Sequence, residues 1–203
     1  MKKTLFVLSA FALVLLGGCS SSGKRDKKTF DEAYRIATNS INAKDTLFLG
    51  FNFGMDSLTA SNRFSDLLDE GKLFQKDGYT RYQFNMREAT FNPAFGLAYE
   101  RDTLYKVSLA FFPENSFPLD LIKMMIVANT LETFSSKGYE VYEKNDKIGG
   151  TDYYFIKNNT VISVISYPQF VMMSYTNAIV ENRMKQEEEN RMKNLKKQTM
   201  SDI

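Results

Sequence analysis

Three acidic residues are close enough in sequence to share one side of a helix, and they are the first candidates for chemistry. Asp66, Asp69 and Glu70 occupy positions i, i+3 and i+4, so on a helix their carboxylates would project together. Such a cluster can bind a hard cation or transfer protons. Because no second group of ligands accompanies it, we interpret it as a solvated helix face and expect no metal, no cofactor and no catalytic residue.

The composition excludes several classes of catalytic site. The chain has 203 residues, with no histidine and one cysteine. A Ser-His-Asp triad, a Cys-His pair and a His-ligated zinc site are therefore impossible, and so is an internal disulfide. We expect a protein that is not an enzyme. A histidine-independent hydrolase is the alternative, although no motif indicates one.

The single cysteine follows a short apolar segment. Lys2 and Lys3 precede residues 5–16, of which only Ser9 is polar. This segment is too short to span a bilayer, which takes about 20 apolar residues, and it is typical of a signal peptide. The sequence Leu16-Gly17-Gly18-Cys19 resembles the lipobox of bacterial lipoproteins. This resemblance implies that residues 1–18 are removed and that Cys19 carries a diacylglyceryl anchor.

The lipobox also predicts a location and a first partner. Two or three acyl chains would hold the protein in a membrane through Cys19, on a flexible tether of residues 19–28. Ser20 resembles the residue found in lipoproteins sorted to the outer membrane, and the tether lacks the acidic run that resembles a surface-export signal in Bacteroidota-type cells. We therefore expect the periplasmic face of the outer membrane.

The charge balance argues against a nucleic-acid partner. Without residues 1–18, two of the 26 basic residues are lost and the 24 acidic residues are all kept, so the formal charges cancel. A nucleic-acid-binding protein should instead carry an excess of lysine and arginine on one surface. We expect no nucleic acid.

Hydrophobic periodicity predicts a helix followed by four strands, twice. We expect an α+β fold in which an antiparallel sheet carries helices on one face, as a single domain over residues 29–176. The repeats cover about residues 55–112 and 116–176. The predicted helices are 56–70 and 119–134, and the predicted strands are 73–75, 79–86, 91–99, 103–112, 139–143, 151–157, 160–166 and 170–176.

Two further helices flank these repeats. Thr29 and Glu32 form a capping box for a helix whose apolar stripe extends to Ile41 and which should end at Asp45. A charged C-terminal helix is predicted within residues 177–203, where the sequence Glu-Asn-Arg-Met-Lys occurs at 181–185 and again at 189–193. This helix is either a solvated extension or a segment that docks on a partner.

Side-chain patterns give more local expectations. In the helix at 56–70, Leu58, Phe64, Leu67 and Leu68 should face the core, and the aromatic segment 47–53 should be a short strand or an extended loop. Adjacent Tyr153 and Tyr154 must lie on opposite sides of a strand. Three Asp-Ser/Thr-Leu triplets, at 45–47, 56–58 and 102–104, look like O-glycosylation acceptors of Bacteroidota, although ordinary caps and turns share this pattern.

The segment Phe53-Gly54-Met55-Asp56-Ser57, which opens a helix after an earlier helix, is similar to the helix starts of small outer-membrane assembly lipoproteins. The two repeats resemble the tandem fold of the beta-lactamase inhibitor protein. The aromatic loop and the C-terminal helix depart from that pattern. The resemblance implies a non-enzymatic role in protein binding or envelope assembly. A glycan- or small-ligand-binding lipoprotein is the alternative, because the chain has 11 tyrosines.

Overall fold

The computed structural model describes residues 28–40, 47–86, 89–113, 117–145 and 150–201. The predicted signal peptide, the lipobox with Cys19 and most of the tether lie outside these residues. Ile41, Asp45 and the first Asp-Thr pair of the proposed glycosylation motifs also lie outside them.

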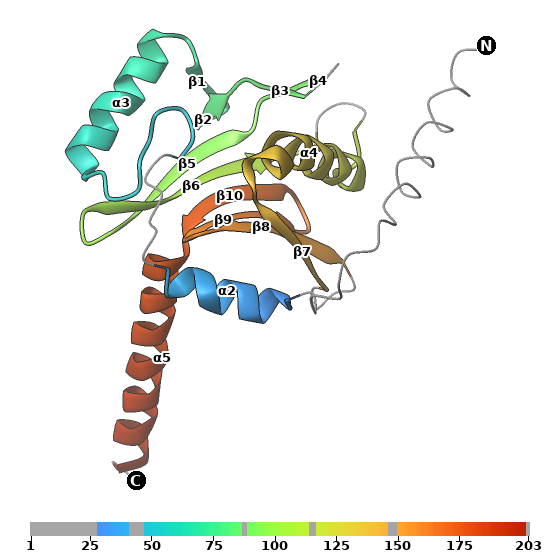
Figure 1. The fold of residues 1–203 in the computed structure, drawn as a ribbon. Coiled ribbons are helices and arrows are strands. Elements are labelled where there is room, and N and C mark those ends of the chain that lie inside the picture. Colours follow the sequence, from blue (N-terminus) through green and yellow to red (C-terminus); the bar gives the residue numbers. More distant parts are fainter. Residues whose placement is uncertain (1–27, 41–46, 87–88, 114–116, 146–149, 202–203) are drawn as a thin grey trace, which may run out of the picture.

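An antiparallel sheet of eight strands forms the centre of the molecule, in the order β1-β2-β5-β6-β10-β9-β8-β7 (Figure 1). Four strands come from each predicted repeat, and the last strands of the two repeats, β6 and β10, pair in the middle. The predicted α+β class and the two helix-plus-four-strand repeats are confirmed. The eight strands are β1 (Leu73–Lys76), β2 (Tyr79–Tyr82), β5 (Ala94–Glu100), β6 (Thr103–Phe111), β7 (Glu140–Asn145), β8 (Thr151–Lys157), β9 (Thr160–Ser166) and β10 (Val171–Asn177).

Two of the predicted strands are interrupted. In the segments predicted at 79–86 and 91–99, β2 and β5 belong to the large sheet. Between them, β3 (Phe84–Met86) and β4 (Ala89–Phe91) form a separate two-stranded sheet. Pro93 precedes β5 and has no N–H to donate to a ladder, while its carbonyl accepts a hydrogen bond of 3.1 Å from the Tyr82 amide. Pro93 therefore lies at the boundary between two pairings, that of β4 with β3 and that of β5 with β2.

One face of the sheet carries the main core, beneath α3 (Ser57–Asp69) and α4 (Leu119–Phe134). The Asp56 carboxylate caps α3 by accepting a hydrogen bond of 2.7 Å from the Thr59 amide. Gly71 follows the helix with a φ of 68°, a left-handed conformation that disfavours residues with a Cβ atom. After α4, a short 3₁₀ turn, η1 (Ser135–Lys137), ends at Gly138. A glycine in the left-handed conformation thus follows α3, and another closes the turn after α4.

The prediction that Leu58 faces the core is wrong. Leu58 is 70% exposed, whereas Leu67 is fully buried. The buried stripe of α3 begins at Ala60 and continues through Phe64 and Leu67. Leu58 lies two residues before Ala60, or about 200° around the helix, because each residue turns about 100°. A small alanine, rather than a leucine, therefore marks the buried side.

The N-terminal helix α2 (Phe30–Thr38) lies on the other face of the sheet. The two repeat helices, α3 and α4, lie on one face of the sheet, as predicted. Helix α2 covers a smaller core on the opposite face. Adjacent strand residues separate the two cores: Phe155 belongs to the main core and Ile156 to the core under α2. Thr29 caps α2 through the Glu32 amide, as predicted.

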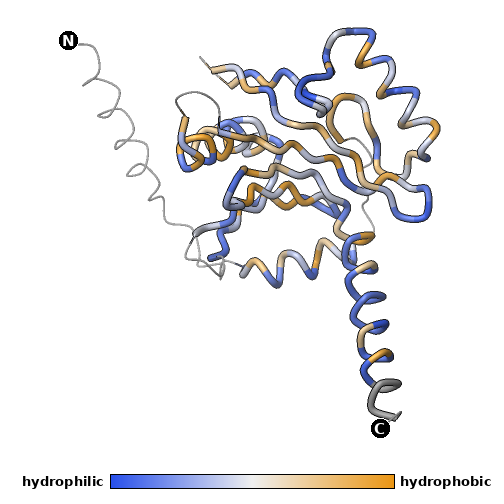
Figure 2. Tube along the Cα trace, turned by 180° about the vertical axis from the view of Figure 1, so that it is seen from behind, coloured by the Kyte–Doolittle hydropathy of each residue, from blue (hydrophilic) through white to orange (hydrophobic). Residues whose placement is uncertain are grey.

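The C-terminal helix α5 (Ala178–Ser201) continues directly from β10 and projects away from the body (Figure 1). Its beginning is packed, since Ala178 is fully buried in the core under α2. Beyond that, the helix is largely hydrophilic (Figure 2). In the part of α5 whose side chains are described, Met192 and Leu195 are both about half exposed, at 46% and 47%.

The aromatic segment before α3 is a loop rather than a strand, but it turns instead of running extended, since Leu49 and Gly50 have φ angles of 57° and 81°. Phe51 is fully buried in the main core. Phe48 stacks on Tyr175 of β10, with a distance of 5.4 Å between ring centroids. This loop fills the space between α3 and the sheet.

Candidate binding site

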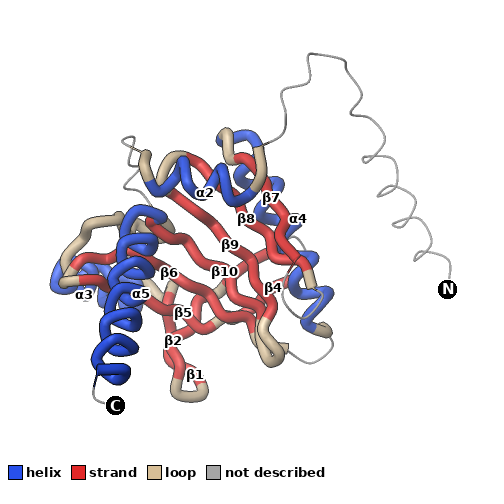
Figure 3. The backbone as a smooth tube through the Cα atoms, turned by 90° about the horizontal axis from the view of Figure 1, so that it is seen from below, coloured by secondary structure: helices blue, strands red, loops and turns tan. Residues whose placement is uncertain are grey.

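The face of the sheet that carries α2 has a floor of small polar residues. Gly96, Ser108, Ser174, Ser163 and Tyr154 are successive cross-strand partners on β5, β6, β10, β9 and β8. Viewed from this side, α2 and α5 border the face, and the described helices leave the middle of the sheet uncovered (Figure 3). Small residues on four adjacent strands therefore form a flat surface that another molecule can approach closely, and Tyr154 stands at one end of this row.

Gly96 places no side chain on this floor. A Cβ atom at this position would lie 3.0 Å from the Ser108 hydroxyl oxygen, closer than ordinary van der Waals contact. The Ser108 hydroxyl instead donates a long hydrogen bond, of 3.4 Å, to the Gly96 carbonyl. The glycine thus leaves room for the serine of the neighbouring strand.

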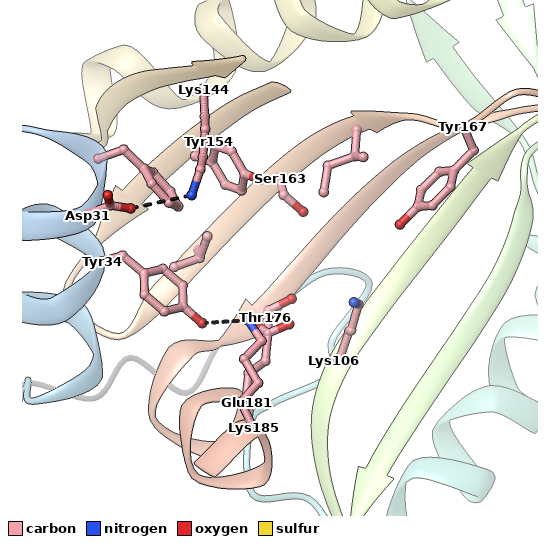
Figure 4. Close-up of a pocket in the computed structure, with 13 residues that line it drawn as sticks. Asp31, Tyr34, Lys106, Lys144, Tyr154, Ser163, Tyr167, Thr176, Glu181 and Lys185 are labelled. Atoms are coloured by element: carbon pink, nitrogen blue, oxygen red, sulfur yellow. Dashed lines mark hydrogen bonds and ion pairs between the residues drawn. The ribbon is translucent and has the colours of Figure 1, made fainter. Parts of the chain in front are cut away.

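A cleft of about 390 Å³ lies where this floor meets α2 and the start of α5 (Figure 4). Its walls come from elements far apart in sequence, and three lysines, two carboxylates and three tyrosines line it. The lining residues are Phe30, Asp31, Tyr34, Lys106, Lys144, Tyr154, Val161, Ser163, Ile165, Tyr167, Thr176, Glu181 and Lys185.

One wall of the cleft is a hydrogen-bonded group that joins α2 to α5. The Tyr34 hydroxyl donates to Glu181 Oε2 at 2.7 Å. Lys185 Nζ lies 3.2 Å from the same carboxylate oxygen and 3.4 Å from the Tyr34 hydroxyl. Burial, reinforced by the hydrogen bond to Glu181, raises the pKa of Tyr34 well above its ordinary value. Tyr34 is therefore a protonated donor at neutral pH.

The opposite wall pairs the second carboxylate with its own cation. Lys144 Nζ lies 3.4 Å from Asp31 Oδ1 and 4.7 Å from the centre of the Phe30 ring. Phe30 also packs on Tyr154, with 4.3 Å between ring centroids. Burial raises the pKa of Tyr154 to about 12, and Asp152 adds to the shift. This wall is largely aromatic, with an exposed ion pair at its rim.

Lys106 stands apart from these pairs. It is partly buried on β6, and within the described residues it forms no ion pair. The strand register shifts beside it: Tyr99 pairs with Leu104 and Ala98 with Lys106, which leaves Tyr105 as the extra residue of a bulge. Bulges re-aim the side chains next to them. In Figure 4 the Lys106 ammonium group points toward the space beside Ser163 and Tyr167.

Tyr167 closes the far end of the cleft. Its ring stacks on Phe170, with 4.8 Å between centroids, and 40% of the residue is exposed. Tyr153, the neighbour of Tyr154, packs against the main core. The prediction that these two tyrosines lie on opposite faces is therefore confirmed, and Tyr154 is the one in the cleft.

The acidic cluster predicted on the second helix lies elsewhere. The Glu70 carboxylate is paired with Arg63 at 3.1 Å and with Lys72 at 2.6 Å. Asp66 and Asp69 are exposed on α3. Among the residues that the structure describes, no group of three potential ligands is arranged to hold a metal ion.

Two of the three proposed glycosylation motifs meet at the start of α3. Asp56 caps the helix, and the Ser57 amide donates a hydrogen bond of 3.3 Å to Asp102 Oδ1. Leu104 is fully buried. Both aspartates thus have a structural use, and Ser57 is exposed.

Sequence reasoning did not identify Lys106, Ser163, Tyr34 or Glu181 as members of a binding site. A signal for the floor was present, because Ser108 lies two residues from Lys106, and Thr176 two residues from Ser174, within otherwise apolar strands. Alternate polar residues of this kind indicate a sheet face that is not packed in the main core. Nothing in the sequence alone placed α2 and α5 beside that face.

Comparisons of the chain with protein-family models, with curated proteins and with solved structures found no match. None of the helices in the described ranges is long and apolar enough to cross a membrane.

Proposed function

We propose that the protein is a non-enzymatic binding protein of the bacterial envelope, anchored in the outer membrane through lipidated Cys19 and facing the periplasm. Its partner is another envelope protein, which binds on the open face of the sheet. The observation that carries this proposal is the row of Gly96, Ser108, Ser174 and Ser163 across four adjacent strands, over which the described helices do not pack.

The physical properties of this face support binding. Strands β6, β10, β9 and β8 each pair with a strand on both sides, so most of their backbone groups are already hydrogen-bonded. The serine side chains of the floor lose little rotamer entropy when a partner covers them, and Gly96 has no side chain to order. Ser108 and Ser163 are partly exposed, whereas Ser174 between them is buried, so two serine hydroxyls of the floor can contact water when it is empty.

The resemblance of the two repeats to the beta-lactamase inhibitor protein, and of the helix start at Phe53–Ser57 to assembly lipoproteins, agrees with a protein-binding role. The lipobox-like segment agrees with an envelope location. Fold alone does not define function, so the open face must be tested directly.

The test is recovery of a partner from native membranes by cross-linking and co-purification of the full chain. Ser108→Arg places a long cation on the floor and should abolish recovery of a stoichiometric partner. Ser65→Arg, the same substitution on the exposed side of α3, is the matched control and should recover the partner like the wild type. Thermal unfolding of both variants checks that they are folded.

Two results would overturn this proposal. Equal recovery by Ser108→Arg and the wild type would remove the open face from the interaction. Loss of the partner on deletion of residues 188–201, with no effect of Ser108→Arg, would make the projecting part of α5 the docking element.

A second candidate function is the binding of a glycan or another small ligand. The observation that favours it is the cleft itself, where Tyr34, Tyr154 and Tyr167 surround a space of about 390 Å³. Pockets of this volume typically hold small molecules. Thermal shifts across a panel of glycans would support this function, and no shift across a broad panel would argue against it.

A further inference from the structure

We infer that the cleft contains an oxyanion-binding site formed by Lys106, Ser163 and Tyr167, and that its ligand is a small hydroxylated molecule carrying a carboxylate or a phosphate. The inference goes beyond the binding of a partner protein, because it assigns a ligand class to the cleft alone.

The charges in the cleft leave one cation uncompensated. Asp31 is paired with Lys144 at 3.4 Å, and Glu181 with Lys185 at 3.2 Å. Lys106 is the third lysine of the lining, and within the described part of the chain it has no carboxylate partner. The cleft therefore has a local charge of about +1, which an anionic group would neutralise.

Two hydroxyl groups add donors beside this cation. The side chains of Ser163 and Tyr167 border the space that the Lys106 ammonium group faces (Figure 4). No other described side chain accepts a hydrogen bond from either hydroxyl. An ammonium group supplies three donors and each hydroxyl one, so a carboxylate or phosphate placed here can be held from several sides.

The rest of the lining suits the body of a hydroxylated ligand. The Glu181 and Asp31 carboxylates and the Thr176 hydroxyl can accept hydrogen bonds, and the Tyr154 ring provides an apolar wall. The volume of about 390 Å³ is larger than an inorganic ion needs and lies within the range of small-molecule sites. An acidic sugar has this combination of one anionic group and several hydroxyls.

The test is titration of the full chain with three probes, glucuronate, inorganic phosphate and uncharged glucose, followed by NMR chemical shifts and calorimetry. Glucuronate should bind at least about tenfold more tightly than glucose, because charge-assisted hydrogen bonds contribute about 1.5–3 kcal/mol. Raising the ionic strength should weaken binding. Phosphate binding without glucuronate binding would identify a phosphate ligand, and the reverse a carboxylate ligand; both support the site.

The variants make the test specific to the cleft. Lys106→Met should weaken binding of the preferred anion at least about tenfold, while Lys106→Arg should retain it. Lys76→Met, the same change at an exposed lysine of β1, should bind like the wild type. If Lys106→Met does not fold, Tyr167→Phe and Ser163→Ala still test the hydroxyl donors.

Saturable binding of neither anion, or equal binding by the Lys106→Met and wild-type chains, would overturn the inference. Either result leaves the proposed protein-binding function untouched, because recovery of a partner is measured separately with Ser108→Arg. Conversely, loss of the partner protein in the Ser108→Arg variant would leave the anion titrations of the cleft unaffected.

Discussion

The Tyr34 hydroxyl of α2 donates a hydrogen bond of 2.7 Å to Oε2 of Glu181 in α5, and these two residues are 147 positions apart in the chain. Lys185 completes the group, with its ammonium nitrogen 5.3 Å from the centre of the Tyr34 ring. The first described helix is thereby joined to the base of the last one. The same contact forms a wall of the cleft, so the stability of α2 and the shape of the site are linked.

Tyr34→Phe should lower the free energy of unfolding by about 1–2 kcal/mol, because a partly buried carboxylate loses a hydrogen-bond donor. Urea denaturation measures this change. In a double-mutant cycle with Glu181→Gln the two effects should not be additive. Additive effects would mean that the hydrogen bond contributes nothing to the stability of the protein.

The raised pKa of Tyr34 predicts a loss of stability at high pH. In the unfolded chain a tyrosine loses its proton near its ordinary pKa of 10.0, whereas burial and Glu181 keep folded Tyr34 protonated to higher pH. The stabilising contribution is therefore complete below pH 10 and declines as the pH rises toward the folded pKa. Unfolding free energies measured from about pH 9 to 11.5 should fall less steeply for Tyr34→Phe than for the wild type. Identical slopes would contradict this assignment.

Ala37→Gln should detach α2 from the sheet. Ala37 is 1% exposed in the small core, whereas its neighbour Ile36 is 43% exposed. A glutamine at position 37 overpacks the contact and buries an amide, with an expected cost of about 1–3 kcal/mol. Ile36→Gln should change stability by less than about 0.5 kcal/mol. Limited proteolysis should cut α2 faster in the first variant only, while the main core stays protected.

Leu67→Ala and Leu58→Ala form a matched pair within α3. Leu67 is fully buried and Leu58 is 70% exposed. The first substitution leaves a cavity and should cost about 2–5 kcal/mol, whereas the second should cost less than about 0.5 kcal/mol. Urea denaturation of both variants measures the difference, and similar costs would contradict the orientation of α3.

Cys19→Ser should move the protein from the membrane fraction to the soluble fraction, because serine does not supply the thiol that accepts the lipid. Ser20→Ala is the control and should stay in the membrane. Cell fractionation and the intact mass of the purified chain measure the anchor. Membrane association and mass unaffected by Cys19→Ser would remove the lipoprotein assignment.

Much of the secondary structure could be predicted because local patterns determine it. The predicted bounds of α4, β8 and β9 agree with the structure residue for residue, since residues that interrupt regular structure flank them: Pro118 precedes α4, and the turn at Asn158-Asn159 separates β8 from β9. The strand breaks near Pro93 were predicted less well. Period two continues across such a break, and only the pairing partners show where one sheet ends.

The site was harder to predict because it depends on non-local contacts. The apolar stripe of α2 indicates that the helix is buried, but not which face of the sheet it covers. Alternation marks Ser108, Ser163 and Ser174 as residues of a polar face, but only the register places them in one row. Of the two ion pairs that leave Lys106 without a carboxylate, Asp31–Lys144 joins α2 to β7 and is non-local, whereas Glu181–Lys185 is an i,i+4 pair within α5.

The pairing of β6 with β10 has a further consequence for the chain as a whole. These strands are equivalent members of the two repeats, they run antiparallel, and Ser108 lies opposite Ser174 near the middle of their contact. This is the arrangement of an isologous dimer interface, here formed within one polypeptide. A fragment that ended after Phe111 would expose β6 as an unpaired edge, and the strand best suited to cover that edge is the same strand of a second fragment.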